Sequence, residues 1–206
     1  LHGSAMAGTI LQGSALTQKA GEGSPIRILP VDVYGGGETT TTFEVALGIK
    51  RAIEGGASII NLSLGTPDDS PYMHNLIRDI TSQGALVLAA PGNQPVTTPS
   101  FPAAYPEVLA VTAGDARGQL AGYANRGGFV DVMAPGTSVV PFNGRRWMIN
   151  GTSVSTAYAS GIAAGLLNQP GMTPAKVLED LRRNLPLPAG FTSAPATAAP
   201  PARENP

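Results

Sequence analysis

The 206-residue sequence predicts an α/β fold, with a mostly parallel sheet that carries helices on both faces. Two observations support this prediction. Short apolar runs alternate with segments of helical period, and the connections between them are short. The run at residues 85–90 does not alternate polar with apolar side chains, which is typical of a parallel strand covered on both faces.

The elements follow in order along the first part of the chain. Residues 26–34 predict a strand that ends at three glycines. Residues 43–54 predict a helix, because apolar positions recur at helical spacing and two glycines follow. The remaining elements predicted in this half are strands at 58–64, 85–90 and 108–113 and a helix at 71–83.

The second part predicts a hairpin and two helices. Residues 138–142 and 146–150 flank Asn143 and Gly144, a dipeptide that supplies the positive φ of a tight hairpin turn. Helices are predicted over 152–168 and 174–184. We assign 1–185 to one domain and expect 186–206, with six Pro and six Ala, to be a linker or tail.

Composition excludes several classes of function. The net charge of -1 and 13% charged residues give no basic patch for nucleic acid or anionic lipid. The absence of cysteine excludes disulfides, thiolate metal sites and cysteine nucleophiles. No apolar run approaches the ~20 residues of a membrane span. The chain begins at Leu1 without an initiator Met or a signal-like segment, so we expect it to be an excerpt of a longer protein.

Two histidines are the candidate general bases. His74 lies beside an apolar stripe at helical spacing, which favours a surface helix residue. His2 opens a run of small residues that would let another backbone approach closely. A histidine held at the end of such a helix is a stronger candidate for chemistry.

Ser153 is the candidate nucleophile. Gly151 permits an unusual backbone conformation, and Ser153 then falls at the start of a helix. A hydroxyl there lies beside free N–H groups and the positive end of the helix dipole, which favours developing negative charge. The alternative is an ordinary N-cap serine.

Two further segments point to the carboxyl ends of strands. Asn93 follows the strand at 85–90, where ligand sites of open α/β sheets lie. Its amide could donate to an oxyanion, although an Asn at this position is also a common turn residue. Gly65 ends residues 61–65, where an extended peptide could lie alongside.

These four segments, in this order, resemble the subtilisin-like serine peptidase family. Residues 2–8 (HGSAMAG) are similar to the family's His-Gly-Thr-x-Val-Ala-Gly motif. Residues 151–161 (GTSVSTAYASG) resemble its Gly-Thr-Ser-Met-Ala-Thr-Pro-x-x-Ala/Ser-Gly motif. Residues 90–93 (APGN) match Ala-x-Gly-Asn, and 60–65 (INLSLG) resemble the Asn-x-Ser-Leu-Gly substrate strand. The resemblance covers residues 1–185.

The resemblance implies a serine endopeptidase with His2 as general base, Ser153 as nucleophile and Asn93 as oxyanion donor. It implies that the substrate is a polypeptide and that the protein is secreted or at the cell envelope. We expect a monomer whose chemistry needs no cofactor and no metal, and structural calcium is left open. The implied peptide cleft is formed by two segments, whose residues are Ser63, Leu64, Gly65, Ala90, Pro91 and Gly92.

The sequence departs from the family in three places. The acid of the triad precedes the histidine in the family, but only Leu1 precedes His2. We therefore expect the acid to lie outside this chain, and we do not assign it to Asp32. Pro91 replaces the usual Ala, and residues 157–158 (AY) replace Pro-x of the nucleophile motif.

Two other classes of function compete with the peptidase. A non-catalytic subtilisin-like domain could serve as a binding or scaffolding module, but it would not need His2, Ser153 and Asn93 together. A nucleotide-binding domain is disfavoured, because the glycines at 35–37 are followed by no Lys-Ser/Thr and no Gly-x-Gly-x-x-Gly opens a helix.

Overall fold

A computed structural model describes residues 2–17 and 26–191. At its centre lies a sheet of four parallel strands in the order β1-β2-β3-β4. The strands are β1 (Ile59–Leu62), β2 (Leu86–Ala89), β3 (Leu109–Gly114) and β4 (Val132–Pro135). The predicted α/β class with a mostly parallel sheet is confirmed.

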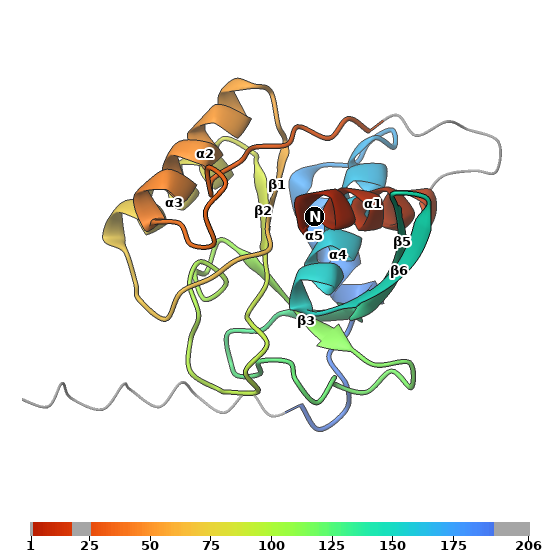
Figure 1. Ribbon diagram of the computed structural model, residues 1–206. Coiled ribbons are helices and arrows are strands. Elements are labelled where there is room, and N and C mark those ends of the chain that lie inside the picture. The colour runs from red at the N-terminus through yellow and green to blue at the C-terminus, as the bar shows by residue number, and fades with distance from the viewer. Residues whose placement is uncertain (1, 18–25, 192–206) are drawn as a thin grey trace, which may run out of the picture.

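Helices cover both faces of this sheet (Figure 1). On one face lie α2 (Thr42–Glu54) and α3 (Pro71–Ser82), and on the other lie α4 (Thr152–Leu167) and α5 (Pro174–Asn184). Strand β2 serves both layers, because Val87 and Ala89 belong to the core under α2 and α3 while Leu86 and Leu88 belong to the core under α4 and α5. This explains the unbroken apolar run.

Three helices begin at capping side chains that the sequence supplies. The Thr41 hydroxyl accepts from the N–H of Glu44 at 3.1 Å. The Thr173 hydroxyl accepts from the N–H of Lys176 at 3.4 Å, and Pro174 occupies the first turn of α5. The Ser70 hydroxyl accepts from the N–H of Met73 at 3.3 Å. Each cap satisfies one N–H that the helix leaves without an acceptor.

Helix α1 (His2–Ala15) packs along α4 at backbone distance. A Cβ on Gly161 would overlap the carbonyl oxygen of Ile10, and a Cβ on Gly13 would overlap that of Tyr158. The helices thus approach closely, but at Gly13 and Gly161. Of the glycines in the run at 2–8, Gly3 has nothing within 4 Å of a Cβ placed there, and Gly8 faces the side chain of Val140.

The predicted hairpin is confirmed as β5 (Thr137–Phe142) and β6 (Arg145–Asn150), which pair antiparallel. Asn143 and Gly144 form the turn with φ of 50° and 70°, the left-handed values that such a two-residue turn needs. The hairpin lies against α1 (Figure 1), where the side-chain amide of Gln12 donates to the carbonyl of Val139 at 2.8 Å. Helix α4 therefore follows directly from a hairpin whose strand β5 packs against α1.

The prediction for residues 26–34 is wrong, because the structure assigns no strand to them. Val31 and Val33 instead pack against the core beside α2, with Val33 occupying the space that a side chain at Gly48 would need. Within the described residues no strand pairs with this segment, so it lacks the hydrogen-bond ladder that defines a strand.

The sequence prediction also omitted β4, which completes the sheet beside β3. Its four residues end at Pro135, and the run is too short to stand out from the turns around it. Of the expected tail, residues 186–191 follow α5 without helix or strand, and the rest lies outside the described residues.

Candidate active site

Ser153 lies in the first turn of α4, as predicted. The preceding Gly151 is the N-cap residue with φ 146° and ψ 163°, a conformation that only glycine adopts readily. The Ser153 hydroxyl is partly exposed and donates to the carbonyl of Ser63 at 3.4 Å. Within the described part of the chain its backbone N–H has no acceptor, as is usual in a first helical turn. A free N–H and a hydroxyl therefore lie together.

Asn93 reaches the same helix from the end of β2. Its Oδ1 accepts two hydrogen bonds from Thr152, from the backbone N–H at 2.9 Å and from the hydroxyl at 3.0 Å. Because an N–H can only donate, these contacts fix which end of the amide faces Thr152. The Nδ2 group lies next to Gly151 and has no acceptor among the described residues. Two N–H groups without an acceptor in this part of the chain, the Asn93 amide and the Ser153 backbone, thus lie on either side of Gly151 at the start of α4, where they could donate to an oxyanion.

His2 lies at the same end of the α1–α4 pair as Ser153. Met6 packs with Val154 and Ala157, while Ile10 meets Gly161 further along, so the two helices run parallel. The first turns of both helices therefore lie together. The structure has no hydrogen bond between His2 and Ser153. Catalytic hydrogen bonds are often long or poorly aligned before substrate binds.

The His2 ring is solvent-exposed, yet the protein atoms around it desolvate it in part. This desolvation lowers the pKa of His2 from its ordinary 6.5, because burial disfavours the charged imidazolium. The neutral form, which can accept a proton, therefore predominates at pH 7.

No carboxylate among the described residues hydrogen-bonds to His2. Asp32, the tempting candidate in the sequence, is engaged elsewhere: its Oδ1 accepts from the backbone N–H groups of Tyr34 at 2.9 Å and Gly35 at 3.1 Å. These contacts make it a turn residue, which agrees with leaving it out of the triad.

The two expected peptide-binding segments lie side by side at the carboxyl ends of β1 and β2. The N–H of Ala90 donates to the carbonyl of Leu62 at 3.0 Å, and a Cβ on Gly65 would lie 3.7 Å from the carbonyl oxygen of Ala90. Ser63 contacts α4 directly, since its hydroxyl donates to the carbonyl of Ser153 at 3.2 Å. Pro91 is buried and Gly92 partly exposed at the start of the loop that carries Asn93.

A cavity of about 660 Å³ opens next to the first of these segments. Leu64 and Gly65 line it, whereas the other four expected peptide-binding residues do not. Its opposite walls come from α2, α3 and the segment around Phe101 and Tyr105. The cavity is large enough for one or more side chains of an extended peptide.

Tyr105 holds one wall of this cavity in place. Its hydroxyl lies 2.9 Å from an Asp69 carboxylate oxygen, to which it donates, and it accepts from the N–H of Ser70 at 3.1 Å. Burial, followed by the contacts with Asp69, raises the pKa of Tyr105 to about 12, although the Ser70 N–H acts in the opposite direction. His74 stacks on its ring at 4.3 Å and pairs with Glu107 at 2.9 Å.

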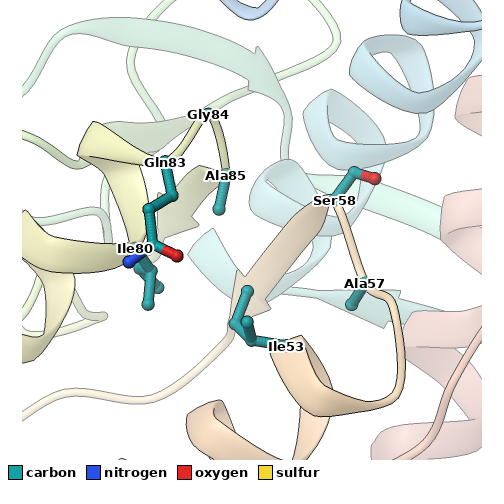
Figure 2. A pocket seen from close by; sticks show the side chains of 7 residues that line it. All are labelled: Ile53, Ala57, Ser58, Ile80, Gln83, Gly84 and Ala85. Carbon is teal, nitrogen blue, oxygen red and sulfur yellow. The ribbon is translucent and has the colours of Figure 1, made fainter.

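A second cavity, of about 200 Å³, lies at the opposite end of the sheet (Figure 2). Ile53, Ile80 and Gln83 border it from the ends of α2 and α3, and Ser58 and Ala85 border it from the segments that lead into β1 and β2. None of its lining residues is charged. This second cavity contains none of the candidate catalytic residues His2, Asn93 and Ser153.

The described residues contain no group of three or more His, Asp or Glu side chains that could hold a metal ion. In the same part of the chain, no helix is both long and apolar enough to cross a bilayer.

Sequence reasoning missed the residues that hold the site together. Thr152, which orients Asn93, was noted only as part of a motif. Asn125 is buried against the loop that carries Asn93, yet in the sequence it is a single Asn in a turn-rich segment that belongs to none of the four motifs. No spacing signal links residue 125 to residue 93, since the contact depends on the sheet topology.

Comparison with known proteins agrees with these observations. A profile described as the subtilase family matches residues 1–193. The thermophilic serine proteinase of Bacillus sp. strain AK1 is 35% identical over 171 residues, which cover 82% of this chain and 43% of that protein. The minor extracellular protease Epr of Bacillus subtilis strain 168 is 32% identical over 192 residues, which cover 89% of this chain and 29% of that protein.

A solved structure is also similar. The prenylagaramide maturation protease PagA has a TM-score of 0.63 and 29% identity, with 68% of this chain and 56% of that chain covered. The chain thus spans about half or less of the length of these proteins.

Proposed function

We propose that this chain, which belongs to the subtilase family, forms part of a serine endopeptidase in which Ser153 attacks the peptide bond. The observation that supports this most strongly is the arrangement at the start of α4. There, Thr152 holds the Asn93 amide by its oxygen, so that Nδ2 and the Ser153 N–H remain without an acceptor among the described residues, near Gly151 at the start of the helix that carries Ser153.

In the proposed reaction the Ser153 Oγ attacks the scissile carbonyl carbon while His2 accepts the hydroxyl proton. The carbonyl oxygen becomes an oxyanion, which receives hydrogen bonds from Asn93 Nδ2 and the Ser153 N–H. Collapse of this intermediate breaks the C–N bond, and His2 returns the proton to the leaving amine. Water then hydrolyses the acyl-enzyme by the same steps, with His2 as base.

The acid of the triad would come from outside the described residues. Its role is to accept the second N–H of His2, which fixes the ring orientation and stabilises the imidazolium. Strand β1 has a pairing partner on one side only, β2, within the described part of the chain. Its free edge is where an additional strand could bring a carboxylate toward His2.

The substrate would be an extended polypeptide lying along Ser63, Leu64 and Gly65, with the loop from Ala90 to Gly92 opposite. A backbone strand can add to such an edge through main-chain hydrogen bonds. The cavity beside Leu64 and Gly65 would take a substrate side chain. By family membership we propose a monomer that acts outside the cytoplasm, secreted or at the cell envelope, with residues 1–185 as its peptidase domain and 186–206 as a tail.

Hydrolysis of chromogenic peptides by the full-length gene product tests this proposal. We expect turnover that an irreversible serine-directed inhibitor abolishes. A folded gene product without turnover on a broad peptide library would instead support the scaffold alternative, in which the cleft binds peptides without cleaving them.

A further inference from the structure

We propose that Asn125 is the positioning residue of the oxyanion site, and that it acts by holding the loop that carries Asn93. This inference rests on the proposed function. Asn125 lies outside every motif of the resemblance and touches none of the reacting groups. Its side chain is only 5% exposed.

The Asn125 side-chain amide hydrogen-bonds to this loop on both sides of Asn93. Its Nδ2 donates to the carbonyl of Pro91 at 2.7 Å, and its Oδ1 accepts from the N–H of Gln94 at 2.7 Å. A carbonyl can only accept and an N–H can only donate, so these partners fix the orientation of the amide. Both contacts need a group that donates on one side and accepts on the other, which a carboxylate cannot do.

Asn125 also contacts Gly92, the residue between Pro91 and Asn93. The backbone N–H of Asn125 donates to the carbonyl of Gly92 at 3.0 Å, and a Cβ on Gly92 would lie 2.7 Å from Asn125 Nδ2. Three residues adjoining or near Asn93 are therefore tied to one buried side chain and its backbone. A side chain at residue 92 would collide with the Asn125 amide.

Asn125 is itself anchored to the centre of the sheet. The hydroxyl of Thr112, which is fully buried in β3, donates to the carbonyl of Asn125 at 2.8 Å. A continuous path of hydrogen bonds and covalent links thus runs from β3 through Asn125 to the loop, and from Asn93 to Thr152 on α4. It sets the position of Nδ2 relative to the Ser153 N–H. An oxyanion donor must be placed before the reaction, because its contribution depends on preorganisation.

The test compares Asn125→Asp with wild type in the full-length gene product. The substitution keeps the size of the side chain and the acceptor for Gln94, but places an oxygen against the carbonyl of Pro91. In subtilisin, a member of this family, loss of the oxyanion-donating Asn lowers kcat about 100- to 1,000-fold, and this range bounds the effect. We expect kcat to fall about 10-fold or more while KM changes less than about threefold.

Competent sites are counted by titration to completion with a fluorophosphonate, and kcat is expressed per titrated site. A variant that only loses folded protein would then show an unchanged kcat. Asn184→Asp, the same chemical change on the exposed end of α5, is the matched control. Asn125→Ser is the second variant, because it removes the amide that bonds to Pro91 and Gln94 without adding a charge.

The deciding measurement is a double-mutant cycle with Asn93→Ala. If Asn125 acts through Asn93, Asn125→Asp changes kcat little in the Asn93→Ala background. Equal losses in both backgrounds, an unchanged kcat, or a loss confined to KM would overturn the inference while leaving the peptidase intact. A wild-type protein that neither reacts with the fluorophosphonate nor cleaves peptides overturns both proposals.

Discussion

The carbonyl oxygen of Ile10 lies where the Cβ of any residue other than glycine would sit at Gly161. This relationship brings the backbones of α1 and α4 together and sets the spacing between the helices that carry His2 and Ser153. The relative position of His2 and Ser153 therefore depends on residue 161 having no side chain.

Gly161→Ala should destabilise the protein by about 1 to 3 kcal/mol, the usual cost of overpacking a tight interior, and lower kcat because the helices must separate. The measurement is chemical denaturation of the full-length gene product, together with its turnover. Gly3→Ala is the control for stability, since a Cβ there meets nothing within 4 Å. It should be neutral or stabilising by up to about 1 kcal/mol. Equal stabilisation by both substitutions would contradict the packing.

His2→Ala should remove most turnover, whereas His74→Ala should leave kcat/KM within a few fold. His74 pairs with Glu107 and stacks on Tyr105, so its loss is expected to appear in stability. The direction in which kcat/KM changes with pH is a further check on His2. Activity needs neutral His2, so kcat/KM should be present above the pKa of His2 and lost as the pH falls through it. Similar kinetic losses in the two variants would show that the wrong histidine has been assigned.

The 206-residue chain alone should be nearly inactive if the acid lies outside it. In subtilisin itself, removal of the triad acid costs roughly 3 × 10⁴ in kcat, and loss of the strand that carries it would add instability. We expect little or no cooperative thermal transition and no efficient cleavage of a chromogenic peptide by residues 1–206. A cooperative transition with efficient turnover would show that another carboxylate serves His2.

Tyr105 should make the protein sensitive to strong alkali. Its pKa is raised from 10.0 to about 12 in the folded state, so folding favours the neutral phenol. The stability that this provides is complete below pH 10 and is lost as the pH rises through 12. Tyr105→Phe should lower stability at neutral pH but flatten the decline between pH 10 and 12. Parallel declines for the two proteins would contradict this account.

Local patterns in the sequence predicted most of the fold. The apolar stripe of α3, the helix at 174–184, and the turn at Asn143 and Gly144 depend on neighbours within a few residues. Residues 26–34 fail for the opposite reason. Their strand-like composition is not enough, because a strand exists only with a paired neighbour.

The candidate site likewise has residues that local sequence signals predict and residues that they do not. Ser153, Asn93 and His2 were predicted because each follows a local signal, a helix start, a strand end and a run of small residues. Asn125 and the Gly161–Ile10 contact were not, since each joins segments that are distant in sequence. Such contacts follow only from the topology.

The most direct test of the account is the identity of the residue that a fluorophosphonate labels in the full-length gene product. We expect mass spectrometry to find the adduct on Ser153, and Ser153→Ala to abolish both the label and peptide cleavage. Ser155 is the control: it is fully buried and donates to the carbonyl of Pro135 at 3.2 Å, so Ser155→Ala should retain both. Labelling of a different serine, with cleavage undiminished in Ser153→Ala, would contradict the assignment.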